Sequence, residues 1–289
     1  MQNYVSLIID IEKSKTYGIE IRNVIQQYMV YCADCLNEIF ANRIQYAVTF
    51  SAGDELQGLF LDVTTAVLYF RLLEILMHPV KVRAGVGVGA WTVKIENGLS
   101  TQQDGPAYHS ARRAIIDVHA MQLHNMRIYS DRDDILTNCL VNASYTLKQQ
   151  QNYMQNFTLI ILELLYPFMS IRGEISRNYA IVLRKLLCSK YEYGLRFKRD
   201  HFTSKASGSL LESAYFDAYH MQPVDVMMID GSLIEAESVI RRKNMALAIS
   251  DVLRCTRQNA DSLMKRGNAN KIRELDYAAL QYIERIYGG

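Results

Sequence analysis

The sequence predicts an α+β protein, with a ferredoxin-like domain over residues 1–130 followed by an α-helical domain over 131–289. Three observations support this prediction. The first part alternates short apolar runs with amphipathic segments, a charged break follows at 131–134, and helical periodicity dominates the remainder. The chain has 289 residues, which is longer than one typical domain, so two domains are expected.

The N-terminal elements follow the order of a split βαβ plan, in which the first strand lies beside a central hairpin. The hairpin is indicated by the Gly53-Asp54 turn between two apolar runs, and Asp62 is a suitable N-cap for the helix that follows. The predicted elements are a strand at 4–11, a helix at 18–41, strands at 44–50 and 55–61, a helix at 62–77, a strand from 80 that runs into another at 90–96, a helix at 106–124 and a strand at 126–129.

Two acidic residues are expected to meet at one edge of this sheet. Asp10 ends the first strand and Asp54 lies in the hairpin turn. Two neighbouring carboxylates repel each other unless a cation lies between them, and such ligands suit Mg²⁺ or Mn²⁺ beside substrate phosphates. The backbone carbonyl of Ile11 is a further candidate ligand, whereas Glu55 alternates away from Asp54 and is the weaker candidate. The alternative is that both aspartates are solvated, one ending a strand and one forming a turn.

A second candidate site begins at Gly105, where a glycine turn enters a helix whose first N–H groups suit an anion. His109 and Arg113 lie four residues apart and share one helix face, while Arg112 points to another side. A cation and an imidazole on one face are suited to hold a triphosphate or to stabilise charge during phosphoryl transfer. A basic helix start with solvated arginines is the alternative.

The C-terminal part contains a predicted helix-turn-helix at about 240–287. Positive charge is concentrated at 240–273, where nine Lys or Arg residues face two Asp, although the net charge of the whole chain is only +2. Protein docking and a purely structural role are the alternatives to DNA contact. Four polar residues at the start of the second helix are expected to face the major groove: Thr256, Arg257, Gln258 and Asn259.

Composition predicts an ordinary globular protein, 49% hydrophobic and 21% charged. A cytoplasmic location is expected, because no signal peptide is recognisable and the five cysteines are odd in number. No membrane partner is expected, because the most apolar stretch, 157–169, is too short to span a bilayer. Cys32 and Cys35 have zinc or redox spacing, but a helical pattern surrounds them and no second pair accompanies them, so two half-buried helix cysteines are expected.

Several motifs in combination resemble the SatD family over essentially the full length of the chain. The C-terminal helix-turn-helix is part of this resemblance. The motifs are Ile-Ile-Asp-Ile at 8–11, Gly-Asp-Glu-Leu-Gln-Gly-Leu at 53–59, Arg-Ala-Gly-Val-Gly-Val-Gly at 83–89 and Asp-Gly-Pro-Ala-Tyr-His-Ser-Ala-Arg at 104–112.

The same blocks resemble, more distantly, the catalytic core of class III nucleotidyl cyclases. This resemblance implies a palm-like ferredoxin core, a homodimer of two cores paired head to tail, and a nucleoside triphosphate whose 3′ hydroxyl attacks the α-phosphate. The implied residues are Asp10 and Asp54 as metal ligands, Arg113 and His109 as catalytic residues, and Ile11, Gly53 and Gly105 as nucleotide-binding positions.

The chain departs from the cyclase pattern at three positions. His109 replaces the transition-state asparagine, Phe50 replaces the lysine that reads adenine, and Gln102 replaces an expected aspartate. Two functions therefore stay open. One is a metal-dependent, cyclase-like enzyme. The other is a DNA-binding regulator whose palm-like domain is a catalytically inactive nucleotide sensor or a dimerisation module. A pure interaction module is a third, weaker possibility.

Overall fold

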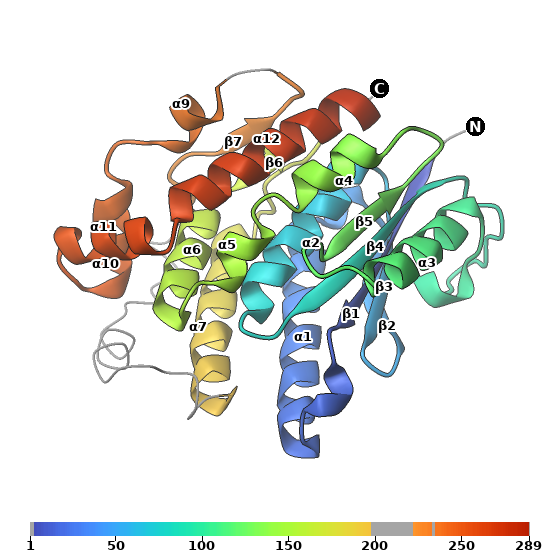
Figure 1. Ribbon diagram of the computed structural model, residues 1–289, viewed down its shortest axis with the longest axis horizontal. Coiled ribbons are helices and arrows are strands. Elements are labelled where there is room, and N and C mark those ends of the chain that lie inside the picture. Colours follow the sequence, from blue (N-terminus) through green and yellow to red (C-terminus); the bar gives the residue numbers. More distant parts are fainter. Residues whose placement is uncertain (1–2, 198–221, 233–234, 289) are drawn as a thin grey trace.

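In Figure 1, a computed structural model of the protein, a five-stranded sheet lies at one end of the molecule and a group of helices at the other. The structure describes residues 3–197, 222–232 and 235–288, and the loop predicted at 200–210 lies outside them. The strands of the sheet are β1 (Tyr4–Ile11), β2 (Ile44–Ala52), β3 (Glu55–Phe60), β4 (Val82–Gly89) and β5 (Met126–Tyr129).

The strand order of this sheet is β2-β3-β1-β4-β5, with β1 in the centre. Neighbouring strands are antiparallel except β4 and β5, which are parallel. The predicted adjacency of the first strand and the hairpin is confirmed, because Val5 pairs with Phe60 and Ile9 with Leu56. The central strand therefore ends beside the start of β3.

The strand predicted at 90–96 is wrong, since β4 ends at Gly89 and Val93 forms only an isolated bridge. The reason is a tertiary contact of Trp91. Its ring meets the rings of Tyr4 and Tyr46 at centroid distances of 5.3 and 5.4 Å, which folds this segment back over the sheet as a loop.

Helices cover both faces of the sheet. They are α1 (Ile19–Ile39), α2 (Val63–Met77) and α3 (Pro106–Val118), the last ending earlier than predicted. Leu7 and Ile9 of β1 join the main core with α1 and α2, whereas Ile8 on the other face packs with Ala111 and Ile115 of α3. This alternation follows from the two-residue period of a strand. The predicted N-cap of α2 is confirmed, because the Asp62 carboxylate accepts the N–H of Thr65 at 2.7 Å.

Helix α3 lies directly on β4 because this strand carries glycines at the contact. A Cβ atom at Gly87 would lie 2.1 Å from the carbonyl oxygen of Ala107, and one at Gly85 would lie 2.4 Å from that of Ala111. No real Cβ contact is that short, so only glycine permits this close approach. The glycines thereby set the position of α3 over the ends of β1 and β3.

The rest of the chain is mostly helical, with a small parallel sheet of two strands that the sequence did not predict. The helices are α4 (Ile135–Val141), α5 (Tyr145–Gln149), α6 (Tyr153–Leu165), α7 (Tyr179–Phe197), α9 (Ala236–Ile240), α10 (Met245–Leu253), α11 (Arg257–Arg266) and α12 (Ala269–Tyr287), and the strands are β6 (Phe168–Ser170) and β7 (Met227–Ile229). Short 3-10 turns lie at Ser14–Thr16, Ala41–Arg43 and Ser100–Gln102.

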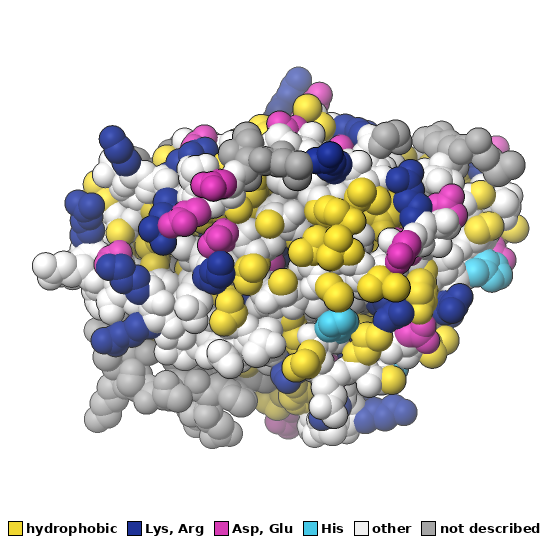
Figure 2. All heavy atoms as spheres, turned by 45° about the horizontal axis from the view of Figure 1, so that its top comes forward, with side chains coloured by type: hydrophobic (Ala, Val, Ile, Leu, Met, Phe, Trp, Pro, Cys, Tyr) yellow, Lys and Arg dark blue, Asp and Glu magenta, His cyan; other side chains and the backbone are white. Residues whose placement is uncertain are grey.

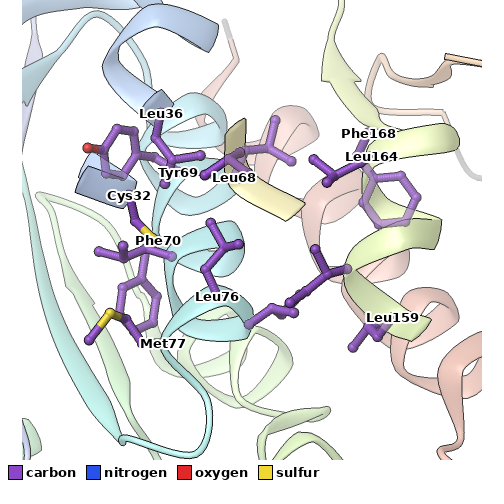
Figure 3. Close-up of a cluster of buried hydrophobic side chains, with 14 of the residues drawn as sticks. Cys32, Leu36, Leu68, Tyr69, Phe70, Leu76, Met77, Leu159, Leu164 and Phe168 are labelled. Atoms are coloured by element: carbon purple, nitrogen blue, oxygen red, sulfur yellow. The ribbon is translucent and has the colours of Figure 1, made fainter. Parts of the chain in front are cut away.

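One hydrophobic core runs through both halves of the chain. Figure 3 shows Leu36 of α1 and Leu68 of α2 on one side of this core and Leu159 and Leu164 of α6 on the other. The boundary near residue 130 stays a prediction, although the core crosses it. Cys32 and Cys35 lie in α1, as expected, but both thiols are buried and not half-buried.

A balanced ion network lies within this core, where α2, α5, α6 and α12 meet. The guanidinium of Arg71 donates to both oxygens of Glu163, at 2.5 and 2.6 Å, and to Asp276 at 2.6 Å. Arg273 is fully buried beside them, so it does not belong to the positive surface expected at 240–273. The cations of this network are Arg71, Lys148 and Arg273, and its acids are Glu74, Glu163 and Asp276.

Among the helices that the structure describes, none combines the length and the apolar composition needed to cross a bilayer.

Candidate functional site

Asp10 lies near the end of β1, on the sheet face that α3 covers. Its carboxylate accepts the Nε–H of Arg83 at 3.1 Å and contacts Nε2 of His119 at 2.5 Å. Arg83 is directly opposite on β4, and His119 immediately follows α3. Asp10 therefore joins the central strand to the next strand and to the helix above it.

Glu55, at the start of β3, is the second acid of this edge. Since Ile9 pairs with Leu56, continuing the register by one residue brings Asp10 opposite Glu55. Directly opposed residues of antiparallel strands project from the same sheet face. Arg112 of α3 donates to both Glu55 oxygens, at 2.5 and 2.8 Å. The register thus places Glu55 on the face of Asp10, while the ranking of Glu55 as the weaker metal ligand stays a prediction.

Asp54 occupies the hairpin turn with Gly53, whose φ of 62° is left-handed. The carbonyl of Gly53 accepts the Nε2–H of Gln26 at 3.1 Å, which ties the turn to α1. Asp54 is half-buried, and its convergence with Asp10 stays a prediction. Ile11 is buried at the end of β1, and its role as a ligand also stays a prediction.

The site is electrostatically balanced. The Asp10 and Glu55 side chains are mostly buried, at 14% and 17% exposure, whereas that of Arg112 is 47% exposed. The hydrogen bond to Glu55 raises the pKa of Arg112 above its ordinary value, and the charge of Asp10 raises it further. The negative charges of the Asp10 and Glu55 carboxylates are therefore matched by the positive charges of the neighbouring Arg83 and Arg112 guanidiniums.

The start of α3 is already occupied by protein acceptors. The N–H of Gly105 donates to the Asp104 carboxylate at 2.8 Å, that of Ala107 to a loop carbonyl at 3.2 Å, and that of Tyr108 to the Gly105 carbonyl at 2.9 Å. His109 contacts the Asp104 carboxylate at 3.0 Å. The amide groups expected to bind an anion at Gly105 are therefore paired within the protein.

Arg113 has a different partner from Arg112. Its guanidinium lies over the ring of Tyr129, 4.6 Å from the centroid, in a cation–π contact. Arg112, which the sequence predicted to point to another side than Arg113, is the arginine that contacts the acidic edge. The catalytic roles of His109 and Arg113 stay predictions.

The helix pair α10–α11 lies at the opposite end of the molecule from the sheet (Figure 1). Thr256 caps α11, because its hydroxyl accepts the N–H of Asn259 at 3.2 Å. Thr256 and the three residues that follow it are exposed, and their contact with DNA stays a prediction. The helix pair is fixed to the segment between α5 and α6 through a buried hydrogen bond of 2.6 Å from Nε2 of Gln151 to the carbonyl of Gly267.

Sequence reasoning missed Arg83 and His119 as well as the contact of Arg112. The sequence carried no usable signal for Arg83, because its place opposite Asp10 follows from the register of β1 against β4. It carried none for His119 either, because the position of this residue depends on how far α3 runs across the sheet. In the described part of the chain, no three His, Cys, Asp or Glu side chains cluster as a preformed metal centre.

Comparison with known protein families gives a match. The model of the SatD family matches residues 4–175, which is more than half of the chain and includes all five strands of the sheet. No curated protein matches the sequence.

Proposed function

This chain belongs to the SatD family, and we propose that it binds a nucleoside triphosphate together with Mg²⁺ or Mn²⁺ at the edge of the sheet formed by β1, β3 and α3. The observation that carries this proposal is the placement of Asp10 and Glu55 at the adjoining ends of two neighbouring strands. Their carboxylates are hard oxygen ligands, which suit these cations, and Arg83 and Arg112 are suited to phosphate oxygens.

The strand order supports the proposal. The segment β1-α1-β2-β3-α2-β4 follows the split βαβ plan, with β1 between β3 and β4. This is the arrangement that the resemblance to nucleotidyl cyclases implies. Asp10 and Glu55 would hold the cation, which would neutralise phosphate charge and orient the triphosphate. A cyclase-like turnover with Arg113 and His109 as catalytic residues is a further step of the proposal.

The test is calorimetric titration with each of the four nucleoside triphosphates in the presence of Mn²⁺. We expect one to bind, and we expect Asp10→Asn to weaken its binding at least about tenfold, since a lost charged ligand typically costs more than 1.4 kcal/mol. Asp34→Asn, which alters an exposed acid on α1, is the matched control. If wild type and Asp10→Asn bind the nucleotide with equal affinity, the proposal is wrong. Mass analysis of the same mixtures shows whether a cyclic product forms.

A second candidate function is DNA binding by α10 and α11. The observation that favours it is the exposed row of Thr256, Arg257, Gln258 and Asn259 at the start of α11, while Ala260 on the same helix is buried. Lys and Arg side chains are numerous at this end of the molecule, with acids between them (Figure 2, left). Side chains of these types contact base edges and phosphates in the major groove.

Retention of double-stranded DNA tests this second function. Arg257→Ala should weaken binding and reduce its dependence on salt concentration, because one cation fewer displaces counterions from the DNA. Lys81→Ala removes an exposed cation beside the sheet and should leave retention unchanged. If Arg257→Ala binds as tightly as wild type across the salt series, α11 is not the reading helix.

A further inference from the structure

Both acids of the candidate site are bound by basic side chains of the protein itself. Glu55 is held by two hydrogen bonds from Arg112, and Asp10 by Arg83 and His119. The two carboxylate charges are thus already balanced by two guanidinium charges. A divalent cation arriving alone would meet a site with no net negative charge, so the Coulomb attraction that normally draws it in would be largely cancelled.

The two arginines differ in how easily each side chain can move away from the carboxylate that it binds. Arg83 belongs to β4, pairs across the sheet with Asp10 and has a side chain that is only 16% exposed. Arg112 is on the outer part of α3 and is 47% exposed. Since the glycines of β4 hold the α3 backbone against the sheet, Arg112 leaves Glu55 by rotation of its side chain and not by movement of the helix.

We infer that Arg112 exchanges Glu55 for the phosphates of a bound nucleotide, so that the nucleotide and the divalent cation bind cooperatively. This inference rests on the proposed function. Guanidinium groups bind phosphate oxygens in the same bidentate manner as carboxylates, so the exchange conserves the hydrogen bonds of Arg112. It frees the Glu55 carboxylate beside Asp10. By linkage, the cation must strengthen nucleotide binding by the same factor.

The experiment measures free Mn²⁺ by electron paramagnetic resonance, with and without the α,β-methylene analogue of the triphosphate that binds. For wild type we expect the Mn²⁺ affinity to rise about tenfold or more when the analogue is present. Arg112→Gln should bind Mn²⁺ alone about tenfold more tightly than wild type does, and should gain little from the analogue. Arg177→Gln is the matched control, because it removes an exposed arginine that lies outside the proposed site, and it should behave as wild type.

The possible outcomes distinguish failure of the Arg112 exchange from failure of the proposed function. Equal Mn²⁺ affinity of wild type with and without the analogue overturns the exchange while leaving the proposed site intact. If the analogue still strengthens Mn²⁺ binding in Arg112→Gln as it does in wild type, the exchange is overturned and the proposed site is again left intact. Absence of Mn²⁺ binding in every protein and condition overturns the proposed function itself. Thermal unfolding followed by circular dichroism confirms that each variant is folded, which is expected because both arginines are exposed.

Discussion

Asparagine side chains of α4 complete the hydrogen bonds of the edge strand β5. Asn138 accepts the N–H of Ile128 at 2.7 Å and donates to its carbonyl at 3.0 Å. Asn142 does the same for Met126, at 3.1 and 2.9 Å. The spacing of four residues places both amides on one face of the helix. They occupy backbone groups that would otherwise be open to pairing with another chain.

Replacement of Asn138 tests this role at the scale of one residue. Asn138→Leu leaves the N–H and the carbonyl of Ile128 buried without partners, so we expect the free energy of unfolding to fall by about 1–3 kcal/mol. Urea denaturation measures the change. Cys139→Ala, at the exposed neighbouring position, should have little effect. Equal denaturation midpoints for Asn138→Leu and wild type would show that the strand edge does not depend on this amide.

The element that shapes the candidate site is α3. Its backbone rests on Gly85 and Gly87, and its side chains Arg112 and His119, the latter just past the end of the helix, reach the two acids of the sheet. Any outward shift of the helix would carry both basic groups away from the carboxylates. The glycines of β4 therefore serve the site as well as the packing.

Gly87→Ala should destabilise the protein by about 1–3 kcal/mol, because the new methyl group would overlap the backbone of α3 at Ala107. Gly18→Ala is the matched control, since a Cβ there meets nothing within 4 Å and the backbone is not left-handed. Urea denaturation compares the two variants. A Gly87→Ala protein as stable as Gly18→Ala would mean that α3 shifts at no cost.

At the scale of the whole molecule, the buried ion network connects helices from both halves of the chain. Lys148 donates to Glu74 at 2.8 Å, and Arg273 contacts Glu163 at 2.6 Å. Arg71 and Arg273 also lie over the ring of Phe168, at 4.7 and 4.4 Å. Removing one charge of such a network leaves another buried without compensation.

Glu163→Gln should therefore lower the free energy of unfolding by about 3–5 kcal/mol, because Arg71 and Arg273 both lose a buried counter-charge. Glu192→Gln changes an exposed glutamate on α7 and should lie within about 0.5 kcal/mol of wild type. The comparison is made by urea denaturation at neutral pH. A loss below 1 kcal/mol in Glu163→Gln would show that the network contributes little.

The same network predicts how stability depends on pH. Burial raises the pKa of Glu163, but Arg273 and Arg71 outweigh it and hold the pKa below its ordinary value; Lys148 and Arg71 do the same for Asp276. A carboxylate with a lowered folded-state pKa stabilises the protein above its unfolded pKa of about 4, and this contribution is lost as the pH falls through the folded pKa. Glu163→Gln should therefore lose stability less steeply than wild type as the pH falls below about 4.

Part of the candidate site was predictable from neighbouring residues alone. An apolar run that ends in Asp10 indicates a strand with an acid at its end, and Asp62 indicates a helix start. Asp54 and Glu55 could not be ranked in this way. Which of them lies opposite Asp10 depends on the register between two strands, and a shift of one residue reverses the answer.

Local periodicity and capping were sufficient to locate the five strands of the sheet, the helices that cover them and the exposed start of α11, since the apolar pattern of each element lies within its own segment. The partners of charged groups were not accessible in this way. Arg112 meets Glu55, Arg71 meets Glu163 and His119 meets Asp10 across wide sequence separations. Such pairs form only when packing sets the distance between the elements that carry them, and that distance is a property of the folded molecule.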